Sequence, residues 1–478
     1  MPQDTRSPSR HPSRNQASRN PEGVAAVLKR LAEFSRCRIE TGESVRAQHA
    51  NTLTGIANEP PDAVVWPNSI EDVARIVRLA GEHRVPLIAF GAGTSLEGQV
   101  NAPFGGISLD MSALNRVVAI NARDHDSTVE AGASRAKLEE SLRDTGLFFS
   151  VDPGTSAATL GGMAATRASG TNTVRYGTMR DNVVSLTAVM ADGSIVRTGG
   201  RARKSAAGYD LTRLLVGSEG TLGIICELTL RLHPVPAGII AAVAPFATIE
   251  GACNATFEAV ETGLGLARIE FLDALQIRAC NLHSKLALDE TPTLFLEFHG
   301  TAIAAREAAA IFGDLARGHG ALRFDWAEGR EERQRLWRAR HDAYWAVRTA
   351  WPGLTAMATD VCVPVSRLAE CVTETAADIL RSGLTAPMVG HVGDGNFHAI
   401  PVFDAGNAEE ARAVRAFLER LAARALAMDG TCTGEHGIGQ GKIGFLEAEI
   451  GPGVEVMRRI KLALDPAGIL NPGKIFYS

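Results

Sequence analysis

The 478-residue chain lacks an excess of basic residues, and this absence excludes one broad class of function. It has 49 lysines and arginines against 54 acidic residues, so its formal net charge is −5. General nucleic-acid binding needs a basic surface that neutralises phosphates, so we expect no nucleic acid among the partners. The chain also lacks any apolar run approaching the roughly 20 residues of a membrane span, so we expect no transmembrane segment.

Paired cysteines are missing as well. The seven cysteines are scattered, odd in number and never spaced as Cys-x-x-Cys, which is typical of free or buried thiols in a reducing compartment. The first twenty residues contain four arginines but no apolar stretch of the kind found in secretory signals. A transit-like segment is an alternative, although its amphipathic stripe is absent. We expect a disordered tail over residues 1–22, and a cytoplasmic protein, with peripheral attachment to the inner membrane left open.

What the chain does contain is enough apolar sequence for more than one core, because 45% of its residues are hydrophobic. Short apolar strands, helices and glycine-rich loops follow one another up to about residue 235. The pattern then changes to longer strands and helices, which indicates a second α+β domain with its own sheet. We therefore divide the chain into the tail, a first domain (23–235), a second domain (236–425) and a C-terminal segment (426–478).

The loop GAGTSLEG (91–98) follows a buried strand, as phosphate-binding turns of dinucleotide folds do. It departs from that pattern twice, because position 96 is Leu96 and the glycines and Pro103 that come next cannot begin a helix. Backbone N–H groups, together with the hydroxyls of Thr94 and Ser95, could still bind a phosphate without a helix. Taken alone, the loop is equally compatible with a tight surface turn.

Two further segments are rich in glycine and other small residues, 152–177 and 217–225. Small residues allow the backbone to approach closely, either to another backbone or to a flat ligand. One such loop is usually structural. Three of them within one domain favour a large, extended cofactor that lies across the backbone.

These three segments occur in the order PLIAFGAGTSLEGQ, DPGTSAATLGGMAATRASGTNTVRYG and GSEGTLGIICE. This order resembles the FAD-binding domain of the vanillyl-alcohol oxidase (PCMH-type) superfamily. From about residue 23 to its end, the chain is similar to the FAD-linked D-lactate dehydrogenases, especially the cytochrome-linked type. The resemblance implies an α+β fold: a PCMH-type FAD-binding domain of two subdomains, an α+β cap domain with an antiparallel sheet for the substrate, and a C-terminal segment that returns to the flavin.

The resemblance also implies which residues bind FAD. The first loop would hold the pyrophosphate, the second segment would line the adenosine and isoalloxazine path, and the third would approach the adenine. An asparagine near the C-terminus would reach the flavin ring. Because the first loop has no histidine to tether the flavin, FAD is expected to be non-covalent. The implied residues are Gly91, Ala92, Gly93, Thr94, Ser95, Pro153, Gly154, Thr159, Gly162, Ser169, Gly170, Gly220, Ile225 and Asn471.

Two histidines flank an Asp-Gly pair in the stretch GHVGDGNFH (390–398). If Asp394-Gly395 is the two-residue turn of a hairpin, His391 faces His398 with Cβ atoms roughly 5 Å apart. Glu435, in a loop with five glycines (430–442), would complete a His₂-carboxylate set with positions open for substrate or water. The residues alone leave a metal site and two hydrogen-bonded loop histidines equally open.

The resemblance favours the metal site, since D-2-hydroxy-acid dehydrogenases of this type carry GHxGDGNxH and GEHG with these ligands. Zinc, manganese and iron(II) all accept such a set. By similarity His436 is the catalytic base, a role that suits histidine near neutral pH. A fourth metal ligand, with water as the base, is the alternative. The pattern LWxxRH singles out Arg340, with His341, for the substrate carboxylate.

Relatives that oxidise 2-hydroxyglutarate carry a lysine and an aromatic residue where this chain has Ala358 and Thr359. This difference favours a small or apolar acid. We therefore expect FAD- and metal-dependent oxidation of a D-2-hydroxy acid, first D-lactate, to the 2-oxo acid, with hydride transfer to flavin N5. Electrons would pass to a quinone, cytochrome c or another carrier. A glycolate oxidase FAD subunit, a D-2-hydroxyglutarate-type dehydrogenase and an alkyldihydroxyacetonephosphate synthase are alternatives, and a homodimer stays open as the assembly state.

Overall fold

The computed structural model describes residues 19–50, 54–341 and 343–477. Most of the expected tail lies outside these residues. The first helix, α1 (Pro21–Phe34), begins inside the range predicted as tail, so that prediction was two residues too long. The reason is local, because the Asn20 side chain accepts a hydrogen bond from the Gly23 N–H and Pro21 occupies the first helical position.

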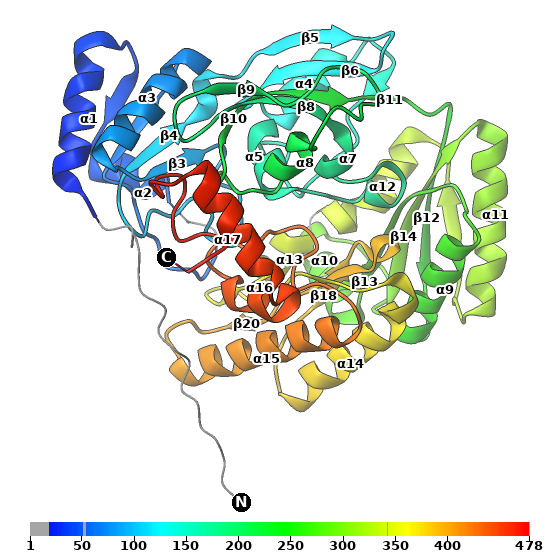
Figure 1. The fold of residues 1–478 in the computed structure, drawn as a ribbon. Coiled ribbons are helices and arrows are strands. Elements are labelled where there is room, and N and C mark those ends of the chain that lie inside the picture. The colour runs from blue at the N-terminus through cyan, green and yellow to red at the C-terminus, as the bar shows by residue number, and fades with distance from the viewer. Residues whose placement is uncertain (1–18, 51–53, 342, 478) are drawn as a thin grey trace, which may run out of the picture.

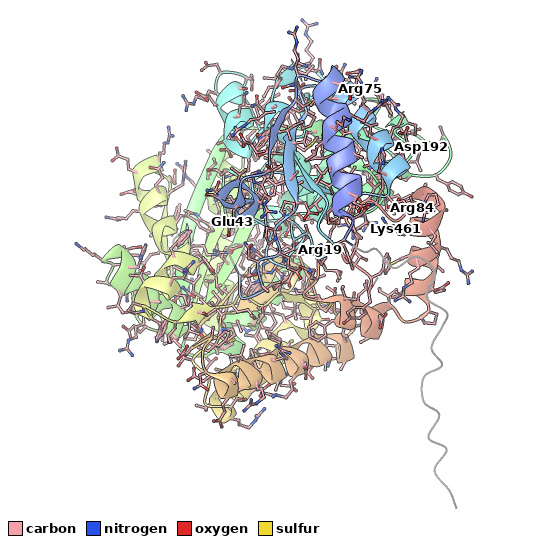
Figure 2. The ribbon with its side chains drawn as sticks, turned by 90° about the vertical axis from the view of Figure 1, so that its left-hand side faces the viewer. Arg19, Glu43, Arg75, Arg84, Asp192 and Lys461 are labelled. Carbon is pink, nitrogen blue, oxygen red and sulfur yellow. The ribbon has the colours of Figure 1, made fainter. Side chains whose placement is uncertain are left out.

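A four-stranded sheet forms the first half of the N-terminal domain. Its strands, in spatial order, are β1 (Arg38–Glu40), β2 (Ala63–Trp66), β4 (Ile107–Asp110) and β3 (Leu87–Phe90). The last three are parallel and β1 is antiparallel. Helices α1 and α3 (Ile70–His83) pack side by side against the sheet, as Figure 2 shows from the side. Ser69 caps α3, because its side chain accepts a hydrogen bond from the Asp72 N–H.

A five-stranded antiparallel sheet forms the second half of this domain. Its strands, in order, are β5 (Val117–Asn121), β6 (Asp126–Glu130), β10 (Ile224–Arg231), β8 (Val183–Val189) and β9 (Ile195–Arg197). Helix α5 (Leu160–Thr166) buries Leu160 and Met163 against it. Val189 and Ile224 reach into the core of the first sheet, so the two halves are packed together.

The second domain is built on a seven-stranded sheet whose pairs are all antiparallel, as predicted. Its strands, in order, are β15 (Asp325–Ala327), β12 (Gly238–Pro245), β14 (Thr293–Gly300), β13 (Leu266–Leu272), β18 (Met388–Gly390), β19 (Asn396–Ala399) and β17 (Val361–Cys362). One face packs against α9 (Ile249–Glu261), α11 (Ala302–Gly318) and α14 (Leu368–Arg381). The other packs against α10 (Ala274–Ser284), α12 (Arg330–His341) and α13 (Ala343–Ala350).

The central strands of this sheet alternate in a way that matters for the site. In β13, Ile269 and Phe271 point into the core with α9 and α11, so Arg268 and Glu270 point to the opposite face. The neighbouring strand β14 places Glu297 on that same face, next to Arg268. The sheet therefore presents charged side chains toward α12, α13 and the N-terminal domain.

The C-terminal segment connects the two domains. Helices α16 (Ile443–Ile450) and α17 (Gly453–Leu464) lie between the N-terminal sheets and α15 (Ala408–Ala427) in Figure 1. The chain then returns to the first sheet, where Asn471 donates its backbone N–H to the Leu87 carbonyl. None of the described helices is both long and apolar enough to cross a membrane.

Candidate active site

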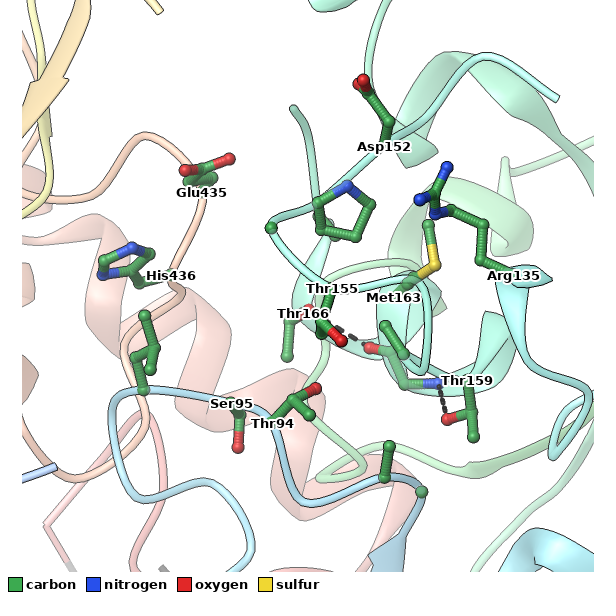
Figure 3. Close-up of a pocket in the computed structure, with 18 of the residues that line it drawn as sticks. Thr94, Ser95, Arg135, Asp152, Thr155, Thr159, Met163, Thr166, Glu435 and His436 are labelled. Atoms are coloured by element: carbon green, nitrogen blue, oxygen red, sulfur yellow. Dashed lines mark hydrogen bonds between the residues drawn. The ribbon is translucent and has the colours of Figure 1, made fainter. Parts of the chain in front are cut away.

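One large cavity, of about 960 Å³, is lined by residues of both domains and of the C-terminal segment. Its volume lies at the upper end of the range for small-molecule sites. Figure 3 shows Glu435 and His436 on one side, and Thr94, Ser95 and Thr159 of the glycine-rich segments on the other. We call the side with Glu435 and His436 the metal wall, after the metal ligands predicted there, and the side with Thr94, Ser95 and Thr159 the flavin wall, after the FAD-binding residues predicted there.

The flavin wall contains twelve of the fourteen residues predicted to bind FAD. The first loop follows β3 without entering a helix, as predicted from its sequence. The twelve that line the cavity are Gly91, Ala92, Gly93, Thr94, Ser95, Pro153, Gly154, Thr159, Gly162, Gly220, Ile225 and Asn471.

Ser169 and Gly170 are not among the residues that line the cavity. The Ser169 hydroxyl donates a hydrogen bond of 2.7 Å to Glu435 Oε2, so it serves the metal wall instead. Gly170 packs against the backbone of Asp152, where a Cβ atom would lie 2.4 Å from the carbonyl oxygen. Their contact with FAD stays a prediction, whereas the hydrogen bond from Ser169 to Glu435 gives this residue a different contact in the structure.

Two features of the flavin wall fit a polar, extended ligand such as FAD. The buried Ser95 Oγ and Asn471 Oδ1 have no hydrogen-bond partner among the described residues. Leaving such an atom unpaired costs about 1–3 kcal/mol, so both are suited to bind ligand. A Cβ atom at Gly91 would lie 2.2 Å from Thr159 Oγ1, and glycine therefore allows the first two segments to touch.

The hairpin that carries the two histidines has a different register from the predicted one. Strands β18 and β19 pair Val389 with His398, so the prediction that His391 pairs with His398 was wrong. The N–H groups of Asp394 and Gly395 donate back to the carbonyls of His391 and Val392, which widens the turn beyond two residues. His391 therefore begins the turn, but its ring centroid still lies 5.7 Å from that of His398.

Each histidine ring has a hydrogen-bond partner at Nδ1, and its Nε2 atom is directed toward Glu435. His391 Nε2 and His398 Nε2 each lie 3.3 Å from Glu435 Oε1. The other nitrogen of His391 lies 2.8 Å from Glu270, and that of His398 lies 2.7 Å from the Thr359 carbonyl. Because a carbonyl can only accept, His398 must donate from Nδ1, which leaves its Nε2 lone pair for a metal. This donor set fits a His₂-carboxylate site.

The charges of the metal wall are strongly coupled. Burial lowers the pKa of His391, but Glu270 and Glu435 outweigh burial and raise that pKa well above its usual value. Burial likewise raises the pKa of Glu435, but His391 and His398 hold it well below the usual range. A divalent cation binding here would therefore compete with a proton on His391.

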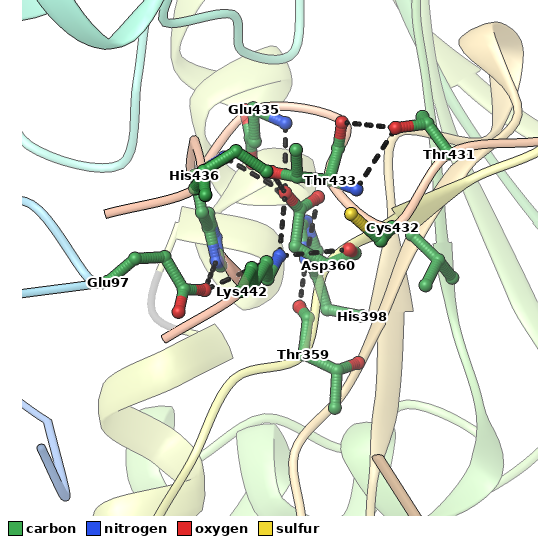
Figure 4. Close-up of polar contacts among 12 residues, drawn as sticks. Glu97, Thr359, Asp360, His398, Thr431, Cys432, Thr433, Glu435, His436 and Lys442 are labelled. Carbon is green, nitrogen blue, oxygen red and sulfur yellow. Dashed lines mark hydrogen bonds and ion pairs between the residues drawn. The ribbon is translucent and has the colours of Figure 1, made fainter. Parts of the chain in front are cut away.

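One buried carboxylate holds the loop that carries Glu435 and His436. Asp360 Oδ2 accepts hydrogen bonds of 2.9 Å from the backbone N–H groups of both residues and one of 2.8 Å from the Thr433 hydroxyl (Figure 4). Lys442 Nζ lies 3.5 Å from the same oxygen. Burial raises the pKa of Asp360, but Lys442 and His436 more than offset this and lower it. The Asp360 carboxylate thus fixes the backbone of a loop whose glycines would otherwise allow many conformations.

The His436 side chain lines the cavity next to the three candidate ligands. Its ring stacks on that of His398 at 5.3 Å, and its Nδ1 lies 3.6 Å from Glu97 Oε1. Burial lowers the pKa of His436, but Asp360 and Glu97 raise it overall. A second group of ligand-type residues, Asp360, His398 and His436, also converges, but the ammonium group of Lys442 already supplies positive charge there. This favours His436 as a base over a fourth metal ligand.

Arg340 lines the cavity from α12. Its Nε donates a 2.5 Å hydrogen bond to Glu270 Oε2, and its remaining N–H groups have no hydrogen-bond partner among the described residues. They are available for a carboxylate. His341 ends α12, but its side chain lies outside the part of the structure that is described.

Sequence reasoning missed four charged residues that organise this site: Glu97, Glu270, Asp360 and Lys442. Glu270 lies 121 positions from His391, and Asp360 lies 75 from Glu435. A signal for Glu270 was present, because a single carboxylate inside the apolar strand LARIEFL must be paired if it is buried. The sequence does not identify its partners.

Two family models match the chain. One, described as an FAD binding domain, matches residues 61–199, and the other, described as the C-terminal domain of FAD linked oxidases, matches residues 235–475. Together they cover the residues predicted to hold the metal and most of those predicted to bind FAD, while Gly220 and Ile225 lie between the two matched ranges.

Curated relatives match most of the chain. A probable mitochondrial D-lactate dehydrogenase of Danio rerio is 50% identical over 95% of this chain and 92% of its own length. A mitochondrial D-lactate dehydrogenase [cytochrome] of Arabidopsis thaliana is 46% identical over 87% of this chain and 73% of its own. A glycolate oxidase subunit of Bacillus subtilis is 32% identical over 87% and 89%.

The fold is also found among solved structures. The 4-ethylphenol oxidase from Gulosibacter chungangensis superposes with a TM-score of 0.79, covering 96% of this chain and 98% of that one. Its sequence is only 20% identical, so the likeness shows a shared fold and no more.

Proposed function

This chain belongs to the family of FAD-linked oxidases and is an FAD-dependent oxidoreductase, and from that premise we propose that it dehydrogenates D-2-hydroxy acids, with D-lactate as the first candidate. One observation carries the proposal. A single cavity joins the glycine-rich flavin wall to a wall that holds His391, His398, Glu435 and His436. The names of its curated relatives support the same reaction.

The chain's own residues can perform the proton chemistry of that reaction. Bound FAD would supply the hydride acceptor, and a divalent cation held by His391, His398 and Glu435 would make the substrate hydroxyl more acidic. His436 takes the hydroxyl proton at Nε2, while Glu97, 3.6 Å from Nδ1, stabilises the imidazolium. The unpaired N–H groups of Arg340 bind the substrate carboxylate.

The cavity residues at and near position 358 favour a small or apolar side chain on the acid. Ala358 lines the cavity beside Val389 and Ile400, and none of the three carries a charge. Thr359 is occupied inside the protein, because its hydroxyl accepts from the Ala399 N–H and its carbonyl faces His398. Positions 358 and 359 therefore offer nothing to hold a distal carboxylate, which favours D-lactate over 2-hydroxyglutarate.

The relatives named as cytochrome-type support a cytochrome as the electron acceptor, for which we propose cytochrome c, with a quinone or another carrier as alternatives. A glycolate oxidase subunit is the second candidate function, favoured by the relative of that name. Activity of the isolated chain with D-lactate would count against it.

Anaerobic bleaching of the flavin absorbance tests the proposal. The FAD-loaded protein is mixed with a panel of D- and L-2-hydroxy acids and glycolate, with and without prior chelation. We expect fast bleaching by D-lactate, little by L-lactate, and strong slowing after chelation. Bleaching by glycolate alone, or undiminished activity in the chelated protein, would contradict the substrate or the metal requirement, respectively.

A further inference from the structure

Glu270 is a fully buried carboxylate at the centre of the seven-stranded sheet. It lies on β13, whose apolar neighbours point into the core on the opposite face. Burying a carboxylate costs several kcal/mol unless it is paired and hydrogen-bonded. Its partners therefore identify what the charge is for.

Each oxygen of Glu270 holds a different functional group. Oε1 lies 2.8 Å from His391 Nδ1, and Oε2 accepts a 2.5 Å hydrogen bond from Arg340 Nε. Burial raises the pKa of Glu270, but His391 and Arg340 offset this and lower it. One anion thus connects a candidate metal ligand to the candidate carboxylate-binding arginine.

We propose that Glu270 is a positioning residue that sets metal affinity and substrate-carboxylate binding together. This inference rests on the proposed function. Holding His391 by Nδ1 turns its Nε2 toward Glu435 and makes that nitrogen a better ligand. Holding Arg340 by Nε leaves the terminal N–H groups of the planar guanidinium for the substrate.

The chain offers a matched control on the adjacent strand. Glu297 is also buried, lies on the same face of the sheet, and pairs with His299 at 2.6 Å and Arg268 at 3.8 Å. Among the described residues, Glu297 forms no ion pair or hydrogen bond with His391, His398, Glu435 or Arg340. Glu297→Gln therefore removes an equivalent buried charge without touching the proposed connection.

The main experiment compares Glu270→Gln, Glu297→Gln and wild type as FAD-loaded proteins. Each is dialysed against Zn²⁺ or Mn²⁺ with a competing chelator, and bound metal is measured without substrate. We expect Glu270→Gln to bind the metal about 10–100-fold more weakly, the usual effect of losing such a partner, and Glu297→Gln to match wild type. The KM for D-lactate should also rise about tenfold or more in Glu270→Gln.

A second variant keeps the test decisive if Glu270→Gln does not fold. Arg340→Ala leaves Glu270 paired with His391, so metal affinity should stay at the wild-type level or increase while KM rises. Loss of metal in Arg340→Ala would mean that the three residues form only a scaffold, and would overturn the inference.

The two proposals fail in different ways. Wild-type protein that binds metal but is reduced by no D-2-hydroxy acid would contradict the proposed function. Equal metal affinity and equal KM in wild type and folded Glu270→Gln would contradict the role of Glu270 alone.

Discussion

The flavin wall of the cavity is built mainly from backbone, whereas the metal wall is built from charged and polar side chains. The flavin wall consists of backbone brought close by glycines, with a few hydroxyl and amide groups such as Ser95 Oγ and Asn471 Oδ1 left without partners. In the metal wall, the side chains of His391, His398 and Glu435 are each held by a contact from a distant segment. The flavin wall should therefore be sensitive to an added methyl group, and the metal wall to a lost charge.

The largest expected effect is on the metal wall. Replacing His391 or His398 by alanine removes a proposed metal ligand, and we expect turnover with D-lactate to fall roughly 1000-fold, which corresponds to the several kcal/mol that a metal contributes. The flavin absorbance should remain, because neither residue belongs to the flavin wall. Metal analysis and steady-state kinetics check this, with His283→Ala on α10 as a histidine control outside the cavity. Full activity in His391→Ala would remove the metal wall from the mechanism.

The next largest effect concerns the charge that holds the loop of Glu435 and His436. Asp360→Asn removes the anion that binds Glu435 N–H, His436 N–H and Lys442. We expect a loss of stability toward the lower end of about 3–5 kcal/mol, since Lys442 keeps Glu97 at 3.4 Å, together with a large fall in kcat.

A control separates these two consequences. Asp378→Asn breaks another buried ion-pair cluster, with Arg420 and Arg424, away from the cavity. It should lower the melting temperature without lowering kcat. An Asp360→Asn variant that melts early but keeps wild-type kcat would show that the loop does not depend on this charge.

A smaller effect is expected on the flavin wall. Gly91→Ala places a Cβ atom within 2.2 Å of Thr159 Oγ1, so the first two segments must move apart. Such overpacking costs about 1–3 kcal/mol, or roughly five- to 150-fold in FAD affinity. Flavin release measured by fluorescence checks this, while metal content should be unchanged. Gly42→Ala, whose Cβ would meet nothing within 4 Å, is the control.

The contrast also explains what the sequence could predict. The glycine-rich segments indicated an extended cofactor, because backbone contact is encoded locally in small residues, and the family resemblance supplied the individual residues of the flavin wall. The two histidines were placed together correctly but through the wrong register. The wider turn is held by long-range contacts as well, including the hydrogen bond from Val363 N–H to the Gly395 carbonyl. Local turn preferences do not contain that information.

Long-range pairs account for the rest of what was missed. Ser169 has the surroundings of a flavin loop, yet its hydroxyl binds Glu435, 266 positions away. Glu270 and Asp360 are single acids in apolar segments, and only the folded sheet shows which cations they meet. An acid in an apolar segment can be predicted to have a partner, but the sequence does not identify that partner.

The smallest expected effect tests the boundary between the walls. Glu219 is buried next to Gly220 of the flavin wall and accepts hydrogen bonds from the N–H groups of Ile438 and Gly439, which follow Glu435 and His436 in the chain. Unlike Glu270 and Glu435, Glu219 forms no ion pair with any described residue, and burial raises its pKa to about 7. Since this pKa is raised above the ordinary 4.5, its contribution to stability is complete below pH 4.5 and is lost as pH rises through 7. Wild type should therefore lose melting temperature relative to Glu219→Gln between pH 5 and pH 8, by on the order of a few degrees. Parallel melting profiles of the two proteins across that range would instead mean that Glu219 stays ionised, with Lys474 as its counter-charge. Buried carboxylates of both walls would then be kept ionised by a nearby cation.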